Sequence, residues 1–333
     1  MSGAYAVTAL VPTFNRASLV SRAVRSILEQ TWPVHEVVVV DDGSEDDTRE
    51  QVGALIAAQP TGGTRIRYQW QPNQGKCAAI NSGLRFVLTP WVAFLDSDDV
   101  WLPEKVALQM QALSLFADCG VSFTDARFAN NASLPMTAFE RTGARYPGNM
   151  GRVPEPHHLF LDTVWPGIHM PTMIVRKELL DRLGGLDRDL PLEHDTDLVF
   201  RLGQVTGFCY VNLPLAVFDR TERREVGLVT QHPIGGSARL LELEKAQRRW
   251  CRLVEWTDPV LHAVLKDRLR STQHKAFREL FPQPAGRKEA RAVLMRGLIE
   301  HRDPRFLVKW LLSYVAPRAL RDLVASRSGV VRS

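Results

Sequence analysis

The stretch Val92-Ala93-Phe94-Leu95-Asp96-Ser97-Asp98-Asp99 ends a short apolar run in three carboxylates within four positions. An apolar run of this length that contains Val and Phe is typical of a buried strand. Because unpaired carboxylates are costly to bury, the acids are expected just past the carboxyl end of that strand, where open α/β sheets have their ligand crevice. Asp96 and Asp98 are two positions apart, so an extended backbone directs both side chains to one face.

Two carboxylates on one face suit Mg²⁺ or Mn²⁺ bound to a phosphorylated substrate. The alternative for this stretch alone is an acidic turn that caps the helix after Pro103. A second run, Val37–Val40, predicts a strand buried on both faces, as in a parallel sheet, and it also stops at acids, Asp41 and Asp42. Neighbouring parallel strands place both acid clusters on one edge of the sheet, where they are expected to form one site.

Short apolar runs alternate along the chain with segments of helical spacing. The predicted strands are 6–11, 36–40, 66–70, 91–95, 120–124, 172–175 and 208–213, and the predicted helices are 18–28, 44–58, 77–87, 103–116, 177–183, 194–202, 238–256 and 260–280. Ser18 and Ser44 are the predicted N-caps of the first two helices. This alternation predicts an α/β fold, Rossmann-like, with a mostly parallel central sheet flanked by helices.

Length and composition indicate an ordinary globular protein of one large or two modest domains, with 333 residues, 45% hydrophobic and 24% charged. Residues 1–215 are the predicted α/β domain, with an irregular stretch at about 127–168 that is typical of a functional loop or lid, and residues 216–333 are the predicted, mainly helical C-terminal region. No apolar run reaches the roughly 18 residues of a membrane span, and the N-terminus lacks the basic start of a secretory signal. Four dispersed cysteines without a CxxC pair argue against zinc and fit a cytoplasmic protein.

The net charge of +5 arises in residues 301–333, which hold seven Lys and Arg against two Asp. The other 300 residues contain 35 basic and 35 acidic side chains, so nucleic acid is not an expected partner. The same tail places Phe306, Leu307, Trp310, Leu311, Tyr314 and Val315 on one helical face, with basic residues beside it. This pattern predicts peripheral membrane contact through residues 305–324. The alternative is that this face of the helix packs on the domain itself, or on a second subunit in a homo-oligomer.

Five motifs taken together carry a family resemblance. They are Val11-Pro12-Thr13-Phe14-Asn15-Arg16, Val40-Asp41-Asp42-Gly43-Ser44, Asn73-Gln74-Gly75-Lys76 with Asn81-Ser82-Gly83-Leu84, Leu95-Asp96-Ser97-Asp98-Asp99, and Gly184-Gly185-Leu186-Asp187 before His194-Asp195-Thr196-Asp197-Leu198. Their order and spacing over residues 6–205 resemble the family 2 glycosyltransferases, whereas residues 215–333 are not covered. The resemblance implies a GT-A fold, a DxD motif, and inverting transfer of a sugar from a nucleotide diphosphate donor, with a UDP-sugar favoured.

The resemblance also implies roles for particular residues. It makes Asp195 the catalytic base, and Asp96, Asp98 and Asp99 the ligands of Mn²⁺ or Mg²⁺, with His232 where some relatives have a further ligand. The implied nucleotide-sugar-binding residues are Pro12, Thr13, Asn15, Arg16, Asp42, Lys76, Asn81, Asp96 and Ser97. One departure is His194, which stands where the family usually has Glu. The structural alternatives are that Asp42 and Asp195 only cap helices, and that Arg16 and Lys76 are solvated.

The lone histidines His157, His158 and His169 are more typical of packed or surface positions than of ligands. The resemblance implies a metal-dependent hexosyltransferase, with residues 1–215 as the nucleotide-sugar transferase domain and 127–168 as its variable acceptor loop. It is expected at the inner face of the plasma membrane, acting on a glycan or lipid-linked acceptor in cell-surface polysaccharide or glycolipid synthesis. A sugar-phosphate nucleotidyltransferase would need a Gly-rich phosphate loop after the first strand, and Pro12–Arg16 contains no glycine. The other alternative is a non-catalytic nucleotide- or glycan-binding module, against which Asp195 argues. A dinucleotide oxidoreductase is excluded because no strand is followed by GxGxxG.

Overall fold

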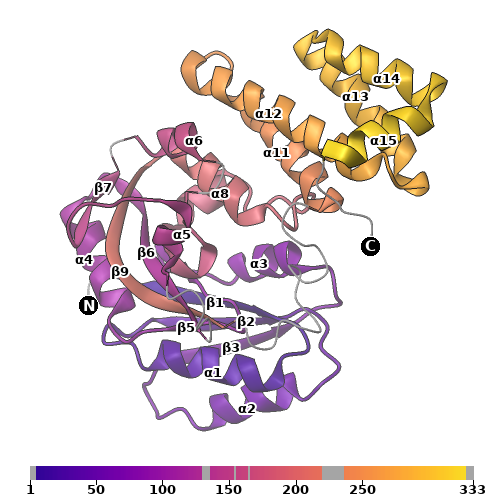
Figure 1. Cartoon of the computed structure of the whole chain (residues 1–333). Helices are drawn as coiled ribbons and strands as arrows, with labels where there is room; N and C mark the ends of the chain where they lie inside the picture. The colour runs from indigo at the N-terminus through magenta and orange to yellow at the C-terminus, as the bar shows by residue number, and fades with distance from the viewer. Residues whose placement is uncertain (1–4, 130–135, 154, 164–165, 220–235, 328–333) are drawn as a thin grey trace. The chain divides into compact units, whose positions relative to one another are not determined.

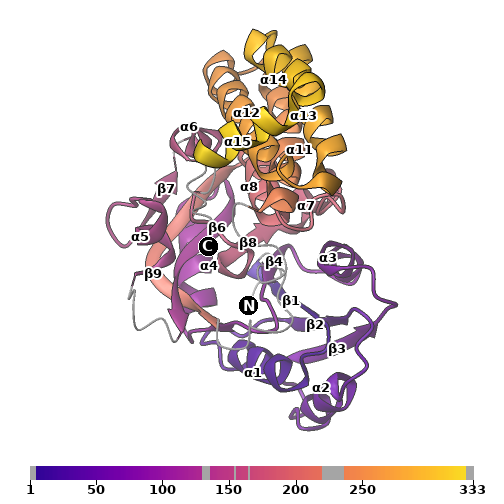
Figure 2. The same ribbon diagram turned by 45° about the vertical axis from the view of Figure 1, so that its right-hand side comes forward.

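The computed structural model describes residues 5–129, 136–153, 155–163, 166–219 and 236–327. Contacts within the chain divide it into two compact units, residues 1–224 and 225–333. Figures 1 and 2 show the strands and their helices in the first unit and the helices of the second. Each unit is described by itself.

The N-terminal half of the first unit is a parallel sheet in the order β3-β2-β1-β4. Its strands are β1 (Val7–Thr13), β2 (Glu36–Asp41), β3 (Arg65–Trp70) and β4 (Trp91–Phe94), and its helices are α1 (Ala17–Leu28), α2 (Thr48–Ala57) and α3 (Lys76–Leu84). Helices α1 and α2 lie on one face and α3 on the other (Figure 1). The chain thus proceeds from β1 outward to β3 and returns to β4 on the other side of β1. Ligand crevices of open α/β sheets form at such a reversal of strand order.

The other half of the sheet continues from β4 in the order β8-β6-β9-β5, with β7 paired to β9. These strands are β5 (Val100–Trp101), β6 (Cys119–Ala129), β7 (Met150–Val153), β8 (Met173–Arg176) and β9 (Gly207–Asp219). Strand β8 is antiparallel to both β4 and β6, whereas β6 and β9 are parallel. The helices of this half are α4 (Lys105–Leu115), α7 (Lys177–Arg182) and α8 (His194–Gly203). A mixed α/β sheet flanked by helices is the architecture that the sequence predicts.

Some local predictions are wrong. Helix α1 begins at Ala17 rather than after a Ser18 cap, and α2 begins only at Thr48. Ser44 caps no helix, because its hydroxyl accepts the backbone N–H of Asn15 at 2.8 Å. Within 127–168, where no element is predicted, lie the end of β6, α5 (Ala138–Thr142), β7 and α6 (Leu159–Asp162). These elements are too short for a hydrophobic period to identify.

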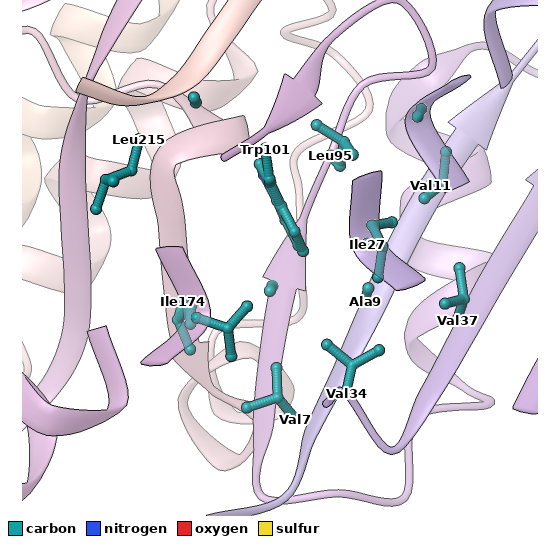
Figure 3. Packing of buried hydrophobic residues seen from close by; sticks show 14 of the residues in the cluster. Val7, Ala9, Val11, Ile27, Val34, Val37, Leu95, Trp101, Ile174 and Leu215 are labelled. Atoms are coloured by element: carbon teal, nitrogen blue, oxygen red, sulfur yellow. The ribbon is translucent and has the colours of Figure 1, made fainter. Parts of the chain in front are cut away.

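Alternate residues of β1 anchor the core that holds the sheet in place. Val7, Ala9 and Val11 point to the same face, where Ile27 of α1 and Val37 of β2 pack against them (Figure 3). All five side chains are almost completely buried. Full burial contributes roughly 1.5–3 kcal/mol for each large aliphatic side chain. The core therefore fixes the register of the strands whose ends carry the predicted site.

The second unit is a set of packed helices. They are α11 (Ser237–Val254), α12 (Pro259–Leu280), α13 (Arg287–His301), α14 (Pro304–Val315) and α15 (Pro317–Arg327). The predicted helices 238–256 and 260–280 are confirmed by α11 and α12. Phe306 of α14 is fully buried against α13, where a Cβ on Gly297 would lie 2.3 Å from its ring. This close approach requires glycine at position 297.

Charge is distributed very unevenly between the two units. Residues 1–224 hold 21 Lys and Arg against 26 Asp and Glu, a net charge of −5, and residues 225–333 hold 21 against 11, a net charge of +10. The basic character therefore belongs to the whole second unit, and the attribution to residues 301–333 alone is too narrow. Among the described residues, no helix combines the length and apolarity needed to cross a membrane.

Candidate active site

The two predicted acid clusters meet at the carboxyl edge of the parallel strands. Strand β1 is hydrogen-bonded to β2 on one side and to β4 on the other. Just past these strands the Asp42 N–H donates to the Thr13 carbonyl at 2.9 Å, and the Leu95 N–H donates to the Leu10 carbonyl at 3.1 Å. The predicted shared edge is confirmed, and it lies at the reversal of strand order.

One carboxylate oxygen each from Asp96, Asp98 and Asp99 lies within 4.8 Å of the others. Asp98 and Asp99 are buried, and Asp96 is partly exposed. Ser97, between them, is buried. Three hard oxygen donors this close together fit Mg²⁺ or Mn²⁺, both of which prefer carboxylate and phosphate oxygens.

Two cations from other elements each pair with one carboxylate of this acidic cluster. Lys76 Nζ, at the start of α3, lies 2.7 Å from Asp96, and Arg16 Nη1, before α1, lies 2.9 Å from Asp98. Burial disfavours the charged forms, but the attraction between Lys76 and Asp96 outweighs it. The pKa of Asp96 is consequently below its ordinary value and the pKa of Lys76 is above its own. Both groups are therefore charged at neutral pH.

Asp42 is tied to the loop before α3. Its carboxylate accepts the side-chain N–H of Gln71 at 2.7 Å and the backbone N–H groups of Gln74 and Gly75 at 3.0 and 2.7 Å. The turn after Asp42 approaches the same loop closely, since a Cβ on Gly43 would lie 2.8 Å from the Asn73 nitrogen. Asp42 therefore shapes the loop that presents Lys76. Its predicted contact with the nucleobase stays a prediction.

The predicted donor residues at the end of β1 lie in the same region. Pro12 and Thr13 are buried, and the Thr13 hydroxyl is buried with no hydrogen-bond partner. Asn15 has a left-handed backbone, with φ of 50°, and its side-chain oxygen accepts the Glu45 N–H at 2.8 Å. A buried hydroxyl without a partner is costly, so the Thr13 side chain favours a ligand at this edge.

Asn81 fastens two distant segments together. Its side-chain amide donates to the Leu186 carbonyl and accepts the Leu186 N–H, both at 2.8 Å. Its amide group thus holds the turn Gly184–Asp187 that leads toward α8. Direct contact of Asn81 with the donor stays a prediction. His232, the predicted additional metal ligand, lies outside the described residues.

Asp195 lies in the first turn of α8, where the helix dipole favours a negative charge. One carboxylate oxygen accepts the Thr196 N–H at 2.8 Å, and the other lies 3.8 Å from Nδ1 of His169. Burial opposes ionisation, but nearby His169 and Lys76 outweigh it and hold the pKa of Asp195 well below its ordinary value. Asp195 is therefore an ionised carboxylate on which the positive charge of Lys76 acts. Its predicted role as the base stays a prediction.

Two histidines complete the surroundings of Asp195. The Nδ1–H of His194 donates to the Pro191 carbonyl at 2.8 Å, a tautomer assigned from this partner because a carbonyl only accepts. Burial, together with the charge of Lys76, lowers the pKa of His194, so the ring is neutral. Sequence reasoning missed His169, because no local pattern distinguishes a single histidine before a strand. Only the fold brings it to Asp195, and its ring rests edge-on against Phe218.

The sequence model described as "Glycosyl transferase family 2" matches residues 8–183. The chain belongs to glycosyl transferase family 2. The family and the enzyme class predicted from the motifs are thereby confirmed: it is a family of glycosyltransferases. The match spans the acid clusters, α3 and His169, and it ends before Asp195.

Curated relatives resemble parts of the chain. It is 27% identical over 210 residues to an uncharacterized glycosyltransferase of Rickettsia prowazekii, a match that covers 61% of this chain and 60% of the relative. It is 30% identical over 133 residues to the Escherichia coli UDP-Glc:alpha-D-GlcNAc-diphosphoundecaprenol beta-1,3-glucosyltransferase WfgD, with 39% and 49% covered. The chain thus spans about half the length of these relatives.

Solved structures share the fold over nearly the whole chain. Residues 1–349 of TarS from S. aureus, in complex with UDP-GlcNAc, match with a TM-score of 0.69 at 16% identity, and the match covers 97% of this chain and 92% of that one. The mannosyltransferase PcManGT from Pyrobaculum calidifontis, in complex with GDP-Man and Mn²⁺, matches with a TM-score of 0.51 at 19% identity, covering 96% and 86%. The predicted GT-A fold with a helical C-terminal region is confirmed.

Proposed function

We propose that the protein transfers a hexosyl group from a UDP-sugar to an acceptor hydroxyl, with inversion at the anomeric carbon and with a divalent cation. The observation that carries the proposal is the arrangement around Lys76. On one side it pairs with Asp96 of the three-carboxylate cluster, and on the other its charge acts on the carboxylate of Asp195. This arrangement supports a donor-phosphate site and a base that are close to each other.

The residues at the sheet edge suit the leaving group. In the proposed reaction the bond between the anomeric carbon and the diphosphate oxygen breaks, and negative charge grows on the diphosphate. A divalent cation held by Asp96, Asp98 and Asp99 would supply Lewis-acid stabilisation of that charge. Lys76 and Arg16 add fixed positive charges beside the same carboxylates. The Mn²⁺ bound with PcManGT and its nucleotide-sugar supports the choice of a divalent cation.

Asp195 suits the role of the base. As the acceptor oxygen bonds to the anomeric carbon, its proton passes to the carboxylate oxygen that faces His169, because the other oxygen is engaged by the Thr196 N–H. Inversion needs only one such base, on the side of the sugar opposite the leaving group. His169, which is partly exposed, is placed to stabilise the anion and to orient it.

Thermal unfolding of the full chain with UDP-, GDP- and dTDP-sugars, each with and without Mn²⁺, tests the donor. We expect a UDP-sugar with Mn²⁺ to raise Tm the most, because a ligand that binds only the folded state stabilises it. Preference for GDP- or dTDP-sugars would overturn the UDP assignment. A chain that no nucleotide-sugar stabilises in the presence of metal would contradict the whole proposal.

We also propose a glycan or lipid-linked acceptor, in cell-surface polysaccharide or glycolipid synthesis at the cytoplasmic face of the plasma membrane, with membrane contact through residues 305–324. The E. coli relative, which is named for a diphosphoundecaprenol-linked sugar, supports this choice. Incubating labelled donor sugar with the protein and a membrane extract, followed by organic extraction, tests it. Label in the lipid fraction is the expected result, and label confined to free sugar would contradict a lipid-linked acceptor.

A further inference from the structure

Helix α14 exposes an apolar face. Six side chains on it are between 37% (Leu312) and 82% (Val315) exposed. They are Leu307, Val308, Leu311, Leu312, Tyr314 and Val315. The helical repeat of 3.6 residues places them along one side of the helix. Contiguous apolar surface of this kind on a folded domain marks an interaction site.

The opposite side of α14 holds the helix in its unit. Phe306 is fully buried and stacks on His274 at 4.1 Å, and Ser313 accepts the Arg291 side chain at 3.1 Å. The face predicted from sequence, which included Phe306 and Trp310, is therefore rotated, since Phe306 is buried and Trp310 is half-buried. The six side chains on the exposed side leave much of their apolar surface uncovered.

Positive charge flanks this face at its two ends. Arg305, which pairs with Asp303 at 2.6 Å, and Arg318 are exposed before and after it. Lys309, by contrast, contacts His274 on the packed side of the helix. The whole unit carries a net charge of +10. Two copies of so basic a unit repel each other, which disfavours a second copy as the occupant of the face. Apolar side chains framed by basic ones complement an anionic bilayer, whose headgroups attract Lys and Arg while its acyl region accepts Leu and Val.

We propose that α14 is an interfacial membrane-docking helix whose face, Leu307 to Val315, inserts into a bilayer containing anionic phospholipid. Its 12 residues are too few to span a bilayer, so the helix lies in the plane of the interface. Tyr314, half exposed and packed against Trp310 with ring centroids 5.1 Å apart, occupies the headgroup level that aromatic rings with a polar group prefer. The inference rests on the proposed function in one respect, since docking brings the active site to lipid-linked acceptors.

Vesicle flotation of the full chain tests the proposal. Vesicles of phosphatidylcholine alone are compared with vesicles of phosphatidylcholine and phosphatidylglycerol. We expect binding to the mixed vesicles only, weakened by salt. Leu311→Ser/Val315→Ser should reduce binding at least about tenfold, because the apolar area that would enter the bilayer is lost. The matched control is Leu253→Ser/Val260→Ser, which removes one exposed Leu and one exposed Val from α11 and α12 of the same unit.

Other outcomes overturn the proposal. Equal vesicle binding by the two double variants would show that the α14 face is not the docking site. Equal binding to the two kinds of vesicle would show that docking does not require anionic lipid. Sedimentation that shows a dimer lost in Leu311→Ser/Val315→Ser would make the face a contact between copies. Donor-dependent stabilisation in detergent-free buffer is measured on the same variants. If a variant loses vesicle binding but is still stabilised by the donor, the loss concerns membrane docking and leaves the proposed function untouched.

Discussion

The sheet edge of the first unit and the α14 face of the second differ in the kind of side chain that would contact the proposed ligand of each. At the sheet edge, carboxylates and cations pair at 2.7–2.9 Å, within a net charge of −5 for residues 1–224. On α14 the side chains are apolar and exposed, and they offer a ligand few directed polar contacts. Residues 225–333, which include this helix, carry a net charge of +10. Small changes of charge or length should therefore disable the first region, whereas only a change of polarity should affect the second.

The largest effect is expected at the base. Asp195→Asn keeps the shape of the side chain but removes the proton acceptor, so we expect kcat to fall by about a thousandfold, the typical scale of general-base catalysis. Donor binding should persist, because Asp195 lies on the acceptor side of the proposed reaction. Steady-state release of UDP with acceptor present measures kcat. Asp181→Asn, an exposed acid paired with Lys177, is the control, and an Asp195→Asn protein as active as this control would remove Asp195 from catalysis.

The second prediction concerns the stability of the helical unit. Phe306→Ala leaves a cavity beside Gly297 and removes the stack on His274, so we expect destabilisation by about 3 kcal/mol or more. Denaturant unfolding followed by far-UV circular dichroism measures it. Leu307→Ala, one residue away but on the exposed face, should change stability by less than about 0.5 kcal/mol. Equal losses in the two variants would contradict the assignment of buried and exposed sides of α14.

The third prediction addresses the metal. Asp98→Ala should reduce kcat about a hundredfold at fixed Mn²⁺ and raise the Mn²⁺ concentration needed for half-maximal activity, because one of the three proposed ligands is lost. Chelation followed by titration with Mn²⁺ measures both quantities. An Asp98→Ala enzyme that needs no more Mn²⁺ than the unmodified protein would exclude Asp98 as a ligand.

A smaller effect is expected at His169. Because its ring lies 3.8 Å from Asp195 and helps to hold that carboxylate, His169→Asn should lower kcat about tenfold and leave KM for the donor unchanged. His157→Asn, at a histidine whose ring packs edge-on against His158, is the comparison. An unchanged kcat in His169→Asn would reduce this residue to a packing role against Phe218.

The smallest effect is a pH dependence confined to the second unit. Burial, followed by Lys309 and Arg305, lowers the pKa of His274 to about 4, and Lys309 donates to its Nδ1 at 3.1 Å. The unfolded chain, with a histidine pKa near 6.5, binds more protons between about pH 6.5 and 4. Stability is therefore complete above pH 6.5 and is lost as the pH falls toward 4.

His274→Phe keeps the stack on Phe306 and removes the titration. Between pH 7 and 5 we expect the variant to lose about 1 kcal/mol less stability than the unmodified protein, a value reduced for the half-exposed ring. Denaturant unfolding at both pH values measures the difference. His301, whose pKa burial also lowers, remains as a background in both proteins. An equal loss of stability between pH 7 and 5 in the variant and the unmodified protein would show that His274 does not set the pH dependence.

The parallel half of the first unit could be predicted from the sequence because its information is local. Val37–Val40 are buried on both faces as their unbroken apolarity predicts, and each acid cluster directly follows its own strand. In the other half, the predicted strands 120–124, 172–175 and 208–213 correspond to β6, β8 and β9. Strands β5 and β7 were not predicted, because two and four residues are too few to show a period.

In the candidate site, too, local features could be predicted and contacts between distant segments could not. The Asp96–Asp99 cluster is local and was predicted, whereas the pairing of Lys76 with Asp96 and of Arg16 with Asp98 depends on the packing of α3 and α1 on the sheet. His169 reaches Asp195 from 26 residues away through β8 and α7, which no sequence spacing encodes. On α14 the helical period was recognisable, but which side is buried depends on the tertiary contacts of Phe306.

The hydrogen bonds between Asn81 and Leu186 have a consequence for how firmly the turn before α8 is held. The two residues are 105 positions apart, and the two bonds tie the turn Gly184–Asp187 to α3. A segment opens locally with a free energy set by the contacts that hold it. Asn81→Ala removes both bonds, so the Leu186 N–H should exchange with solvent faster while exchange in β1 stays unchanged, which hydrogen exchange followed by mass spectrometry measures.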